Sequence, residues 1–236
     1  ATAASATVTV VNPLDPDDSF GLPANMGNFY AAVRQLSLAP SDQGYRRAAV
    51  AAAEAMARGL QRSSAEVVAA RDAADQELQV QAGEATRLAA RVASLNAQVR
   101  RSRASGAEPN DLIDARRLAA EELASLTGAR IGEQDGDVQV QLGATALVVG
   151  DAAASFSTAA DSTNSGHLAV VVDGMGGATA TRGDGEVGGR IGGILHGRDS
   201  GLGAVEARLD QLAFDFATAV NTVHQAGIAL DGSSGR

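Results

Sequence analysis

One short run combines residue types that could carry out hydrolytic chemistry. His167 opens an apolar stretch that ends in Asp173 and continues as Gly174-Met175-Gly176-Gly177. The β-branched residues before the aspartate predict a strand, and the glycines predict a turn directly after it. A carboxylate and a backbone carbonyl at such a turn are oxygen ligands that hard divalent cations prefer, and a bound cation can activate water.

The run His167–Gly177 resembles the metal-binding motif of metal-dependent Ser/Thr protein phosphatases. The resemblance implies that Asp173 and a glycine carbonyl would help to hold two divalent ions. The Gly-Glu pair expected after the glycines is not in register, and the sequence has no upstream Arg-x-x-Asn-Glu-Asp segment and no closing Asp-Asn pair. A metal-dependent phosphatase is therefore only the alternative function, and a strand entering a glycine-rich turn is the simpler interpretation.

Other residues that could bind a ligand lack the required context. Gly188–Gly193 is glycine-rich before a helix, but it has no Gly-Lys-Ser/Thr and no parallel βαβ frame, so close backbone packing explains it better than a phosphate cradle. His167, His196 and His224 lie far apart, and none has a partner at the spacing of a helical metal pair. We predict no catalytic, cofactor-binding or metal-binding residues and no cofactor.

Composition narrows the class of protein. The 236-residue chain has a net charge of −9, which disfavours nucleic acid and anionic membrane as partners. It has no cysteine, so disulfides and thiolate sites are excluded. No apolar stretch is long enough to span a membrane, and no signal peptide is visible. The first residue is Ala1, and we expect the chain to be an excerpt from a longer protein.

The longest predicted element is a helix from Ser41 to Arg103, which contains no proline. It would be about 90 Å long at ~1.5 Å per residue. A heptad seam runs along it, and nine of its twelve positions are apolar. The seam residues are Leu60, Ser64, Val67, Arg71, Ala74, Leu78, Gln81, Ala85, Leu88, Val92, Leu95 and Val99. The polar positions favour a helix covered by neighbours in a bundle, and self-assembly through the seam is the alternative.

The predicted elements before the long helix are short. Residues 1–24 form a lead-in, with a strand at 7–11 and a polar loop after it. A helix over about 25–38 follows, Pro40 ends it, and Ser41 is expected to cap the long helix.

After the long helix the chain is expected to reverse. Gly106 stands where a helix C-terminal cap belongs, and a second helix is predicted over 110–127 with Asn110 or Asp111 as its N-cap. The short loop implies that this helix runs antiparallel to the long one, so residues 25–128 form the long helices of a rod domain.

From Ala129 apolar and polar residues alternate, as in β-strands, and this predicts a small β region over 129–187 of the same domain. Asp135-Gly136 reads as a hairpin turn, and further strands are expected at 145–149, 153–158 and 167–172. Residues 188–236 then return as helix, with a short turn around 191–195 and a last helix over about 201–225. The predicted fold is α+β: an elongated, mainly helical bundle with long antiparallel helices and a small antiparallel β-hairpin region inserted between them.

Four segments, in order, resemble the flagellar hook-associated protein 1 family. The first segment shares Phe29, Tyr30, Leu36, Pro40, Ser41, Arg46, Val50, Ala53 and Ala57, and Ala39 stands where the family has Asn. The second segment shares Val92, Leu95, Asn96 and Val99. The third segment shares Gly106, Pro109, Asn110, Asp111, Leu112, Asp114, Arg116 and Leu123, and Arg117 departs from the family's Asp.

The fourth segment lies at the C-terminal end of the resemblance, and the four segments are specific only together. It begins with Gly188–Leu195 and continues through Arg198, Asp199, Leu209, Asp210, Leu212, Ala213, Val220, Asn221, His224 and Gly227. Together the segments span about residues 20–235.

The resemblance implies a non-enzymatic structural subunit at the hook–filament junction of the bacterial flagellum. It would act by protein–protein packing in a helical tube. The implied partners are other copies of itself in the junction ring, the hook protein and the next hook-associated protein. An export chaperone would bind only through terminal helices that are not in this sequence. The implied location is outside the cell, after export by the flagellar secretion apparatus, and this fragment is expected to be monomeric, to lack the terminal helices and to form an inner rod-like domain.

Overall fold

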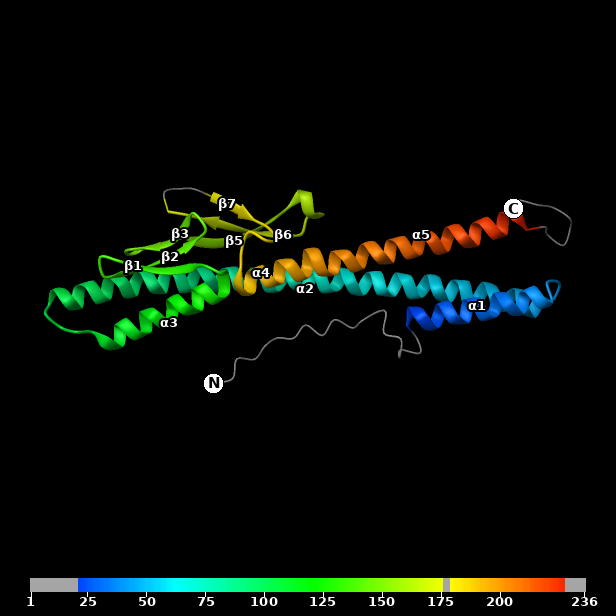
Figure 1. Ribbon diagram of the computed structural model, residues 1–236, viewed down its shortest axis with the longest axis horizontal. Coiled ribbons are helices and arrows are strands. Elements are labelled where there is room, and N and C mark those ends of the chain that lie inside the picture. Colours follow the sequence, from blue (N-terminus) through cyan, green and yellow to red (C-terminus); the bar gives the residue numbers. More distant parts are fainter. Residues whose placement is uncertain (1–20, 176–178, 228–236) are drawn as a thin grey trace. The chain divides into compact units, whose positions relative to one another are not determined.

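The computed structural model describes residues 21–175 and 179–227 (Figure 1). Contacts divide the chain into two compact units. Unit 1 comprises Ala1–Ala70 and Ala204–Arg236, and unit 2 comprises Arg71–Gly203. The predicted strand at 7–11 lies outside the described residues. The division into a lead-in, long helices, β region and returning helix stays a prediction.

The long predicted helix is present as α2, Gln43–Ala104, and it contributes to both units. The prediction that Ser41 caps it was wrong. The Asp42 carboxylate accepts from the backbone N–H groups of Gly44 at 2.7 Å and Tyr45 at 3.1 Å, because it directly precedes the first helical residue. Gly106 closes the helix as predicted: its φ is 84°, and the N–H of Ala107 bonds back to Ser102.

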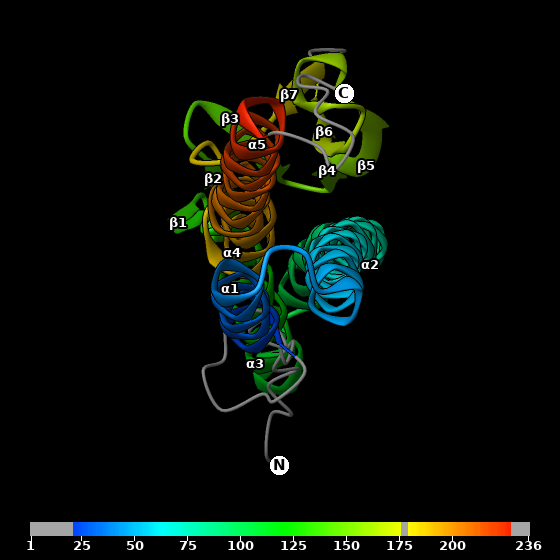
Figure 2. The same ribbon diagram turned by 90° about the vertical axis from the view of Figure 1, so that its right-hand side faces the viewer.

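In the described residues of unit 1, three helices lie side by side in Figures 1 and 2. They are α1 (Leu22–Leu38), the first part of α2, and α5 (Gly203–Ala226). Gly59 of α2 allows α1 to approach, since a Cβ there would lie 2.7 Å from the Asn25 amide nitrogen. The buried apolar core is small: Leu22, Ala49, Met56, Leu60, Val67 and Leu209.

Unit 2 is built on the second part of α2. Helix α3 (Asn110–Thr127) has the predicted bounds. Its N-cap is Pro109, which makes no side-chain cap bond, so the predicted cap by Asn110 or Asp111 was wrong. Both residues lie inside the first turn of α3. An N-cap residue stands before the helix, where its side chain can accept from the free backbone N–H groups of that turn.

Two antiparallel sheets pack in unit 2, where the sequence predicted one β region. The first sheet has the order β1 (Arg130–Gln134), β2 (Asp137–Leu142), β3 (Thr145–Val149) and β4 (Ala152–Ala153). The second has the order β5 (Ser155–Ala160), β6 (Leu168–Asp173) and β7 (Thr179–Arg182). The predicted hairpin turn is confirmed, because Asp135 and Gly136 both have positive φ, at 54° and 82°, between β1 and β2.

The core of unit 2 joins α2, α3, α4 (Gly189–His196) and both sheets. Its fully buried members include Leu78, Ala85, Ala89, Val92, Ala120, Leu123, Val140, Leu147, Val148, Val170, Val172, Ile191 and Leu195. The buried seam residues of α2 in this unit therefore face neighbouring elements of the same chain. The chain is α+β and mainly helical, as predicted.

The helical return is less interrupted than predicted. A π-helix, η2 (Gly197–Leu202), connects α4 to α5. The sequence predicted a short turn around 191–195 and a separate last helix over about 201–225, but Gly197 and Gly203 both have right-handed helical φ and ψ and continue the helix. Among the helices of the described residues, none is both long enough and apolar enough to cross a bilayer.

Candidate functional site

Asp173, the residue of the phosphatase alternative, ends β6. It pairs with Ser155 and Thr179 in the second sheet, and its carboxylate accepts a bond from the Thr179 hydroxyl at 2.8 Å. Within residues 21–175 and 179–227, only one group of His and acidic side chains converges closely enough to hold a metal, and Asp173 is not part of it. A two-metal hydrolase needs several carboxylates at one place, so the structure does not favour the phosphatase alternative.

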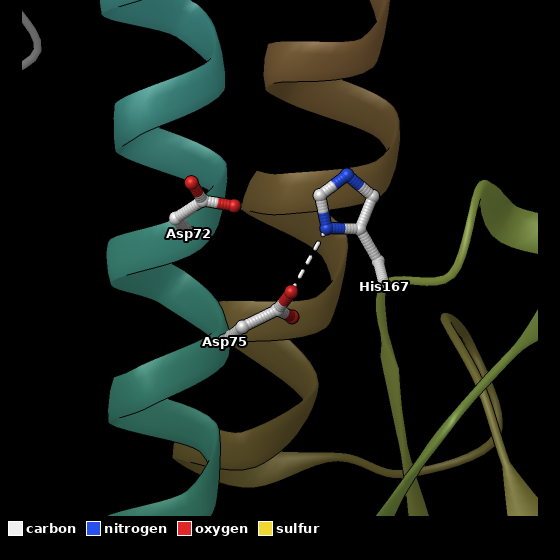
Figure 3. A group of neighbouring side chains, drawn as sticks. All are labelled: Asp72, Asp75 and His167. Atoms are coloured by element: carbon white, nitrogen blue, oxygen red, sulfur yellow. Dashed lines mark hydrogen bonds and ion pairs between the residues drawn. The ribbon is translucent and has the colours of Figure 1, made fainter.

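The convergent group comprises Asp72, Asp75 and His167, whose ligand atoms all lie within 4.8 Å of one another (Figure 3). The two aspartates extend from one face of α2, one turn apart, and His167 stands just before β6. His167 Nδ1 lies 2.8 Å from Asp75 Oδ2. The sequence treated His167 as an isolated residue, and only the fold brings it against a carboxylate 92 positions away.

Asp75 is also held by two further donors. Its Oδ1 accepts the Leu168 backbone N–H at 3.2 Å and an Nη1–H of Arg198. Burial alone would raise the pKa of Asp75, but the bonds from His167 and Arg198 outweigh burial and lower that pKa below its ordinary value. Asp75 is therefore a stably ionised acceptor at neutral pH.

Arg198 is the centre of this network, and its side chain is only 1% exposed. Its Nε and Nη2 donate to both oxygens of Asp199 at 2.7 and 2.8 Å, and its Nη1 also reaches the Leu168 carbonyl at 2.6 Å. The Asn164 amide donates to Asp199 Oδ1 at 2.8 Å. Burial would raise the pKa of Asp199, but the bonds from Arg198 and Asn164 lower it. Arg198, Asp75 and Asp199 thus connect α2, β6 and η2.

This network is better suited to holding elements together than to binding a metal. A divalent cation at Asp75 would have to displace the His167 contact and come close to the Arg198 guanidinium. Arg198 donates four hydrogen bonds, to two carboxylates and one backbone carbonyl. The cluster therefore holds α2, β6 and η2 together, and it is called a buried interlock below.

A second buried interlock joins α2 to α3 and the β1–β2 hairpin. The Asn96 side chain donates to the carbonyls of Val138 and Gly150 at 2.8 and 2.7 Å and accepts the Val138 N–H at 3.0 Å. Arg116 donates to Asn96 Oδ1 at 3.2 Å and to the Gly136 carbonyl at 2.9 Å. Asn96 and Arg116 were singled out by the family resemblance, and their structural role explains why polar residues occupy these helix faces.

The glycine run Gly188–Gly193 allows close packing, as predicted. A Cβ on Gly189 would lie 2.3 Å from the Ser125 carbonyl oxygen, and one on Gly192 would lie 2.1 Å from the Val187 carbonyl oxygen. Gly189 also has a positive φ of 60°. Gly189 lets α4 approach the end of α3, and Gly192 lets it pack against the backbone of Val187. At both positions a side chain would force the backbone to move.

The remaining two histidines lie apart from the interlocks. His196 Nδ1 is 3.2 Å from Asp184 Oδ2 on the surface. His224 lies in the last turn of α5 and lines an apolar groove on unit 1. This groove, called the unit 1 groove below, has a volume of about 790 Å³ and is lined by α1, α2 and α5. Sequence analysis did not identify it, because amphipathic helices do not reveal which part of an apolar face stays uncovered.

Comparisons with known proteins agree with this fold. Residues 10–236 match the family model described as "Flagellar hook-associated protein FlgK helical domain". Flagellar hook-associated protein 1 of Escherichia coli K12 is 34% identical over 152 residues, which is 62% of this chain and 28% of that protein. The protein of the same name from Salmonella typhimurium LT2 is 28% identical and covers 96% of this chain.

A solved structure extends the similarity to three dimensions. The flagellar hook junction protein FlgK from Burkholderia pseudomallei superposes with a TM-score of 0.83 at 27% identity, covering 95% of this chain and 40% of that one. The chain spans 42% of the length of the Salmonella relative. Because the family model matches nearly the whole sequence, this chain belongs to the flagellar hook-associated protein FlgK helical-domain family.

Proposed function

We propose that this chain is the helical domain of a structural subunit at the junction between hook and filament of the bacterial flagellum. The observation that carries the proposal is the family match over residues 10–236. A structural relative named as a flagellar hook junction protein supports it. In this role the domain contributes stiffness and packing surfaces, and no residue carries out catalysis.

The polar chemistry of unit 2 supports a non-enzymatic role. The residues that could do chemistry, Asp75, His167 and Arg198, are committed to one another and to backbone groups. An active site usually keeps at least one such group free to meet a substrate. The interlocks instead fix α2 against the sheets.

The proposed partners are other copies of the same subunit, the hook protein and the next hook-associated protein. The proposed location is outside the cell, after export by the flagellar secretion apparatus. An export chaperone would act only through parts of the protein outside this chain. Nucleic acid and membrane are not proposed as partners.

Deletion of the full-length gene, followed by complementation, tests the proposal. The deletion strain should assemble hooks without attached filaments and lose swimming motility, and the intact gene should restore both. Attached filaments in the deletion strain would contradict the proposal. A phosphoesterase assay of the purified chain with Mn²⁺ tests the alternative, which requires activity that Asp173→Ala abolishes.

A further inference from the structure

One glycine on the outer side of α2 makes no room for any other part of the described chain. Gly83 lies in the interior of the 62-residue helix, is exposed, and a Cβ at this position would meet nothing within 4 Å. A glycine inside a helix costs roughly 0.5–1 kcal/mol relative to alanine. Gly59 of the same helix differs, because it gives α1 room to approach. Gly83 therefore indicates close approach by something outside the described chain.

Gly83 belongs to a face of α2 that carries positive charge. Four exposed residues at helical spacing lie on one side of the helix: Val80, Gly83, Arg87 and Arg91. Val80 is 62% exposed. Arg87 pairs with Glu84 of the same helix, whereas the Arg91 guanidinium has no hydrogen bond or ion pair among the residues that the structure describes. These four residues are called the α2 face below.

Helix α3 has an exposed face of the opposite charge. Three residues at the spacing i, i+3 and i+7 form it: Asp111, Asp114 and Leu118. Leu118 is 56% exposed, while Leu123 and Leu126 of the same helix are buried. The carboxylates of both aspartates have no hydrogen bond or ion pair within residues 21–175 and 179–227. These three residues are called the α3 face below.

The two faces match in register when α3 of one copy lies antiparallel to α2 of another. Leu118 placed over Gly83 brings Asp114 opposite Arg87, because both residues lie four positions away and both helices rise by ~1.5 Å per residue. Asp111 then lies next to Arg91. The missing side chain at Gly83 leaves space for Leu118, so the apolar contact and both charge contacts form together.

The opposite orientation loses the charge contacts. With α3 parallel to α2 and Leu118 again over Gly83, the two aspartates lie beside Gln76 and Gln79 instead of the arginines. Charge complementarity thus favours the antiparallel arrangement, since it sets the register of two surfaces more strongly than a single apolar contact does.

We propose that the α3 face of one copy of this subunit docks antiparallel on the α2 face of the next copy. This inference rests on the proposed function and names the surfaces through which copies meet. Because the two faces differ, each copy offers one face to each of two neighbours. Contacts of this kind produce rings or helical assemblies, not closed dimers. Each contact is small, so we expect stable association only where many copies assemble together.

Cross-linking of engineered cysteines tests the proposal, because residues 1–236 contain no cysteine. The variant Gly83→Cys/Leu118→Cys is made in the full-length gene, and both thiols lie at exposed positions where they leave the fold intact. Cells that express it are treated with a short bis-maleimide, and products are detected by immunoblot. The controls are the unsubstituted protein, each single variant, and Gly83→Cys/Val149→Cys, since Val149 is 40% exposed but belongs to β3.

We expect dimers, trimers and larger products from Gly83→Cys/Leu118→Cys, and at least about 10-fold less product from every control, because the contact holds the two thiols at a high effective concentration. Absence of the larger products, or an equal amount from the Val149 control, would overturn the proposal. Dimers formed by Leu118→Cys alone would show that α3 meets α3, and a product containing a different protein would assign the face to that protein. Either result contradicts docking of α3 on α2.

Charge reversal tests the register. Arg91→Asp added to the cross-linking variant should lower the amount of product at least about 10-fold, because it places like charges opposite each other. Asp111→Arg added in turn should restore the product, and Arg62→Asp, at an exposed position of α2 in unit 1, should leave it unchanged. No restoration would show that the register is wrong.

The cross-linking result is separate from the motility result. If the intact gene restores filaments and motility but no cross-linked products form, the proposed function stands and the docking surfaces are wrong. If the products form but the deletion strain keeps its filaments, the copies meet as inferred and the proposed function is wrong.

Discussion

Loss of the Arg198 guanidinium should destabilise unit 2 far more than loss of an exposed arginine. The Arg198 side chain is 1% exposed, while its partners Asp75 and Asp199 are 15% and 16% exposed. Arg198→Met keeps much of the buried aliphatic volume but leaves two ionised carboxylates without their counter-charge. Breaking a buried pair in this way costs about 3–5 kcal/mol. Since water reaches the carboxylates in part, we expect the lower end, about 3 kcal/mol.

Arg58→Met is the matched control. Arg58 pairs with Glu54 at 3.4 Å, and both side chains are mostly exposed, at 58% and 61%. A pair of this kind contributes at most about 0.5 kcal/mol. Urea unfolding followed by circular dichroism at 222 nm gives the free energy of unfolding of each variant. Hydrogen exchange of peptides from 71–203 shows whether the loss lies in unit 2.

A third variant separates charge from packing. Adding Asp75→Asn and Asp199→Asn to Arg198→Met removes the uncompensated charges and should recover part of the lost stability. If Arg198→Met costs less than about 1 kcal/mol, or no more than Arg58→Met, then the buried interlock does not hold the elements together as argued.

The other predictions concern acid stability, the glycine run and the long helix. The folded-state pKa values of Asp75 and Asp199 lie below the ordinary 3.8. Their ion pairs therefore stabilise the fold fully above that pH and are lost as the pH falls through the lowered values. The free energy of unfolding should fall more steeply below about pH 4 in the wild type than in the Arg198→Met/Asp75→Asn/Asp199→Asn variant. Gly192→Ala should cost at least about 2 kcal/mol in urea unfolding, since its Cβ would lie 2.1 Å from the Val187 carbonyl oxygen. Gly193→Ala, with nothing within 4 Å of its Cβ, should be neutral or stabilising by up to about 1 kcal/mol, and equal effects would contradict the packing argument. Leu88→Pro should cost at least ~3 kcal/mol, because Leu88 is buried in the interior of α2; an unchanged Tm would refute the packed-helix interpretation.

Local signals in the sequence were sufficient for much of the fold. Proline and glycine at helix ends predicted the bounds of α3 and the end of α2, because these residues restrict or permit backbone conformations on their own. Asp135-Gly136 identified the hairpin turn for the same reason. The seam of α2 predicted a covered helix, and the spaced motifs pointed to the family that the comparisons then showed.

Tertiary structure alone decided which polar residues meet. His167 and Arg198 lie 92 and 123 positions after Asp75 in the sequence. No periodicity connects residues so far apart. The choice of Asp42 over Ser41 as cap also depended on where the chain first turned helical. Sequence patterns indicate which backbone conformation each segment adopts with its neighbours in the chain. The interlocks and the unit 1 groove arise only when separate elements pack, because the packing determines both which buried charges are paired and which apolar faces remain uncovered.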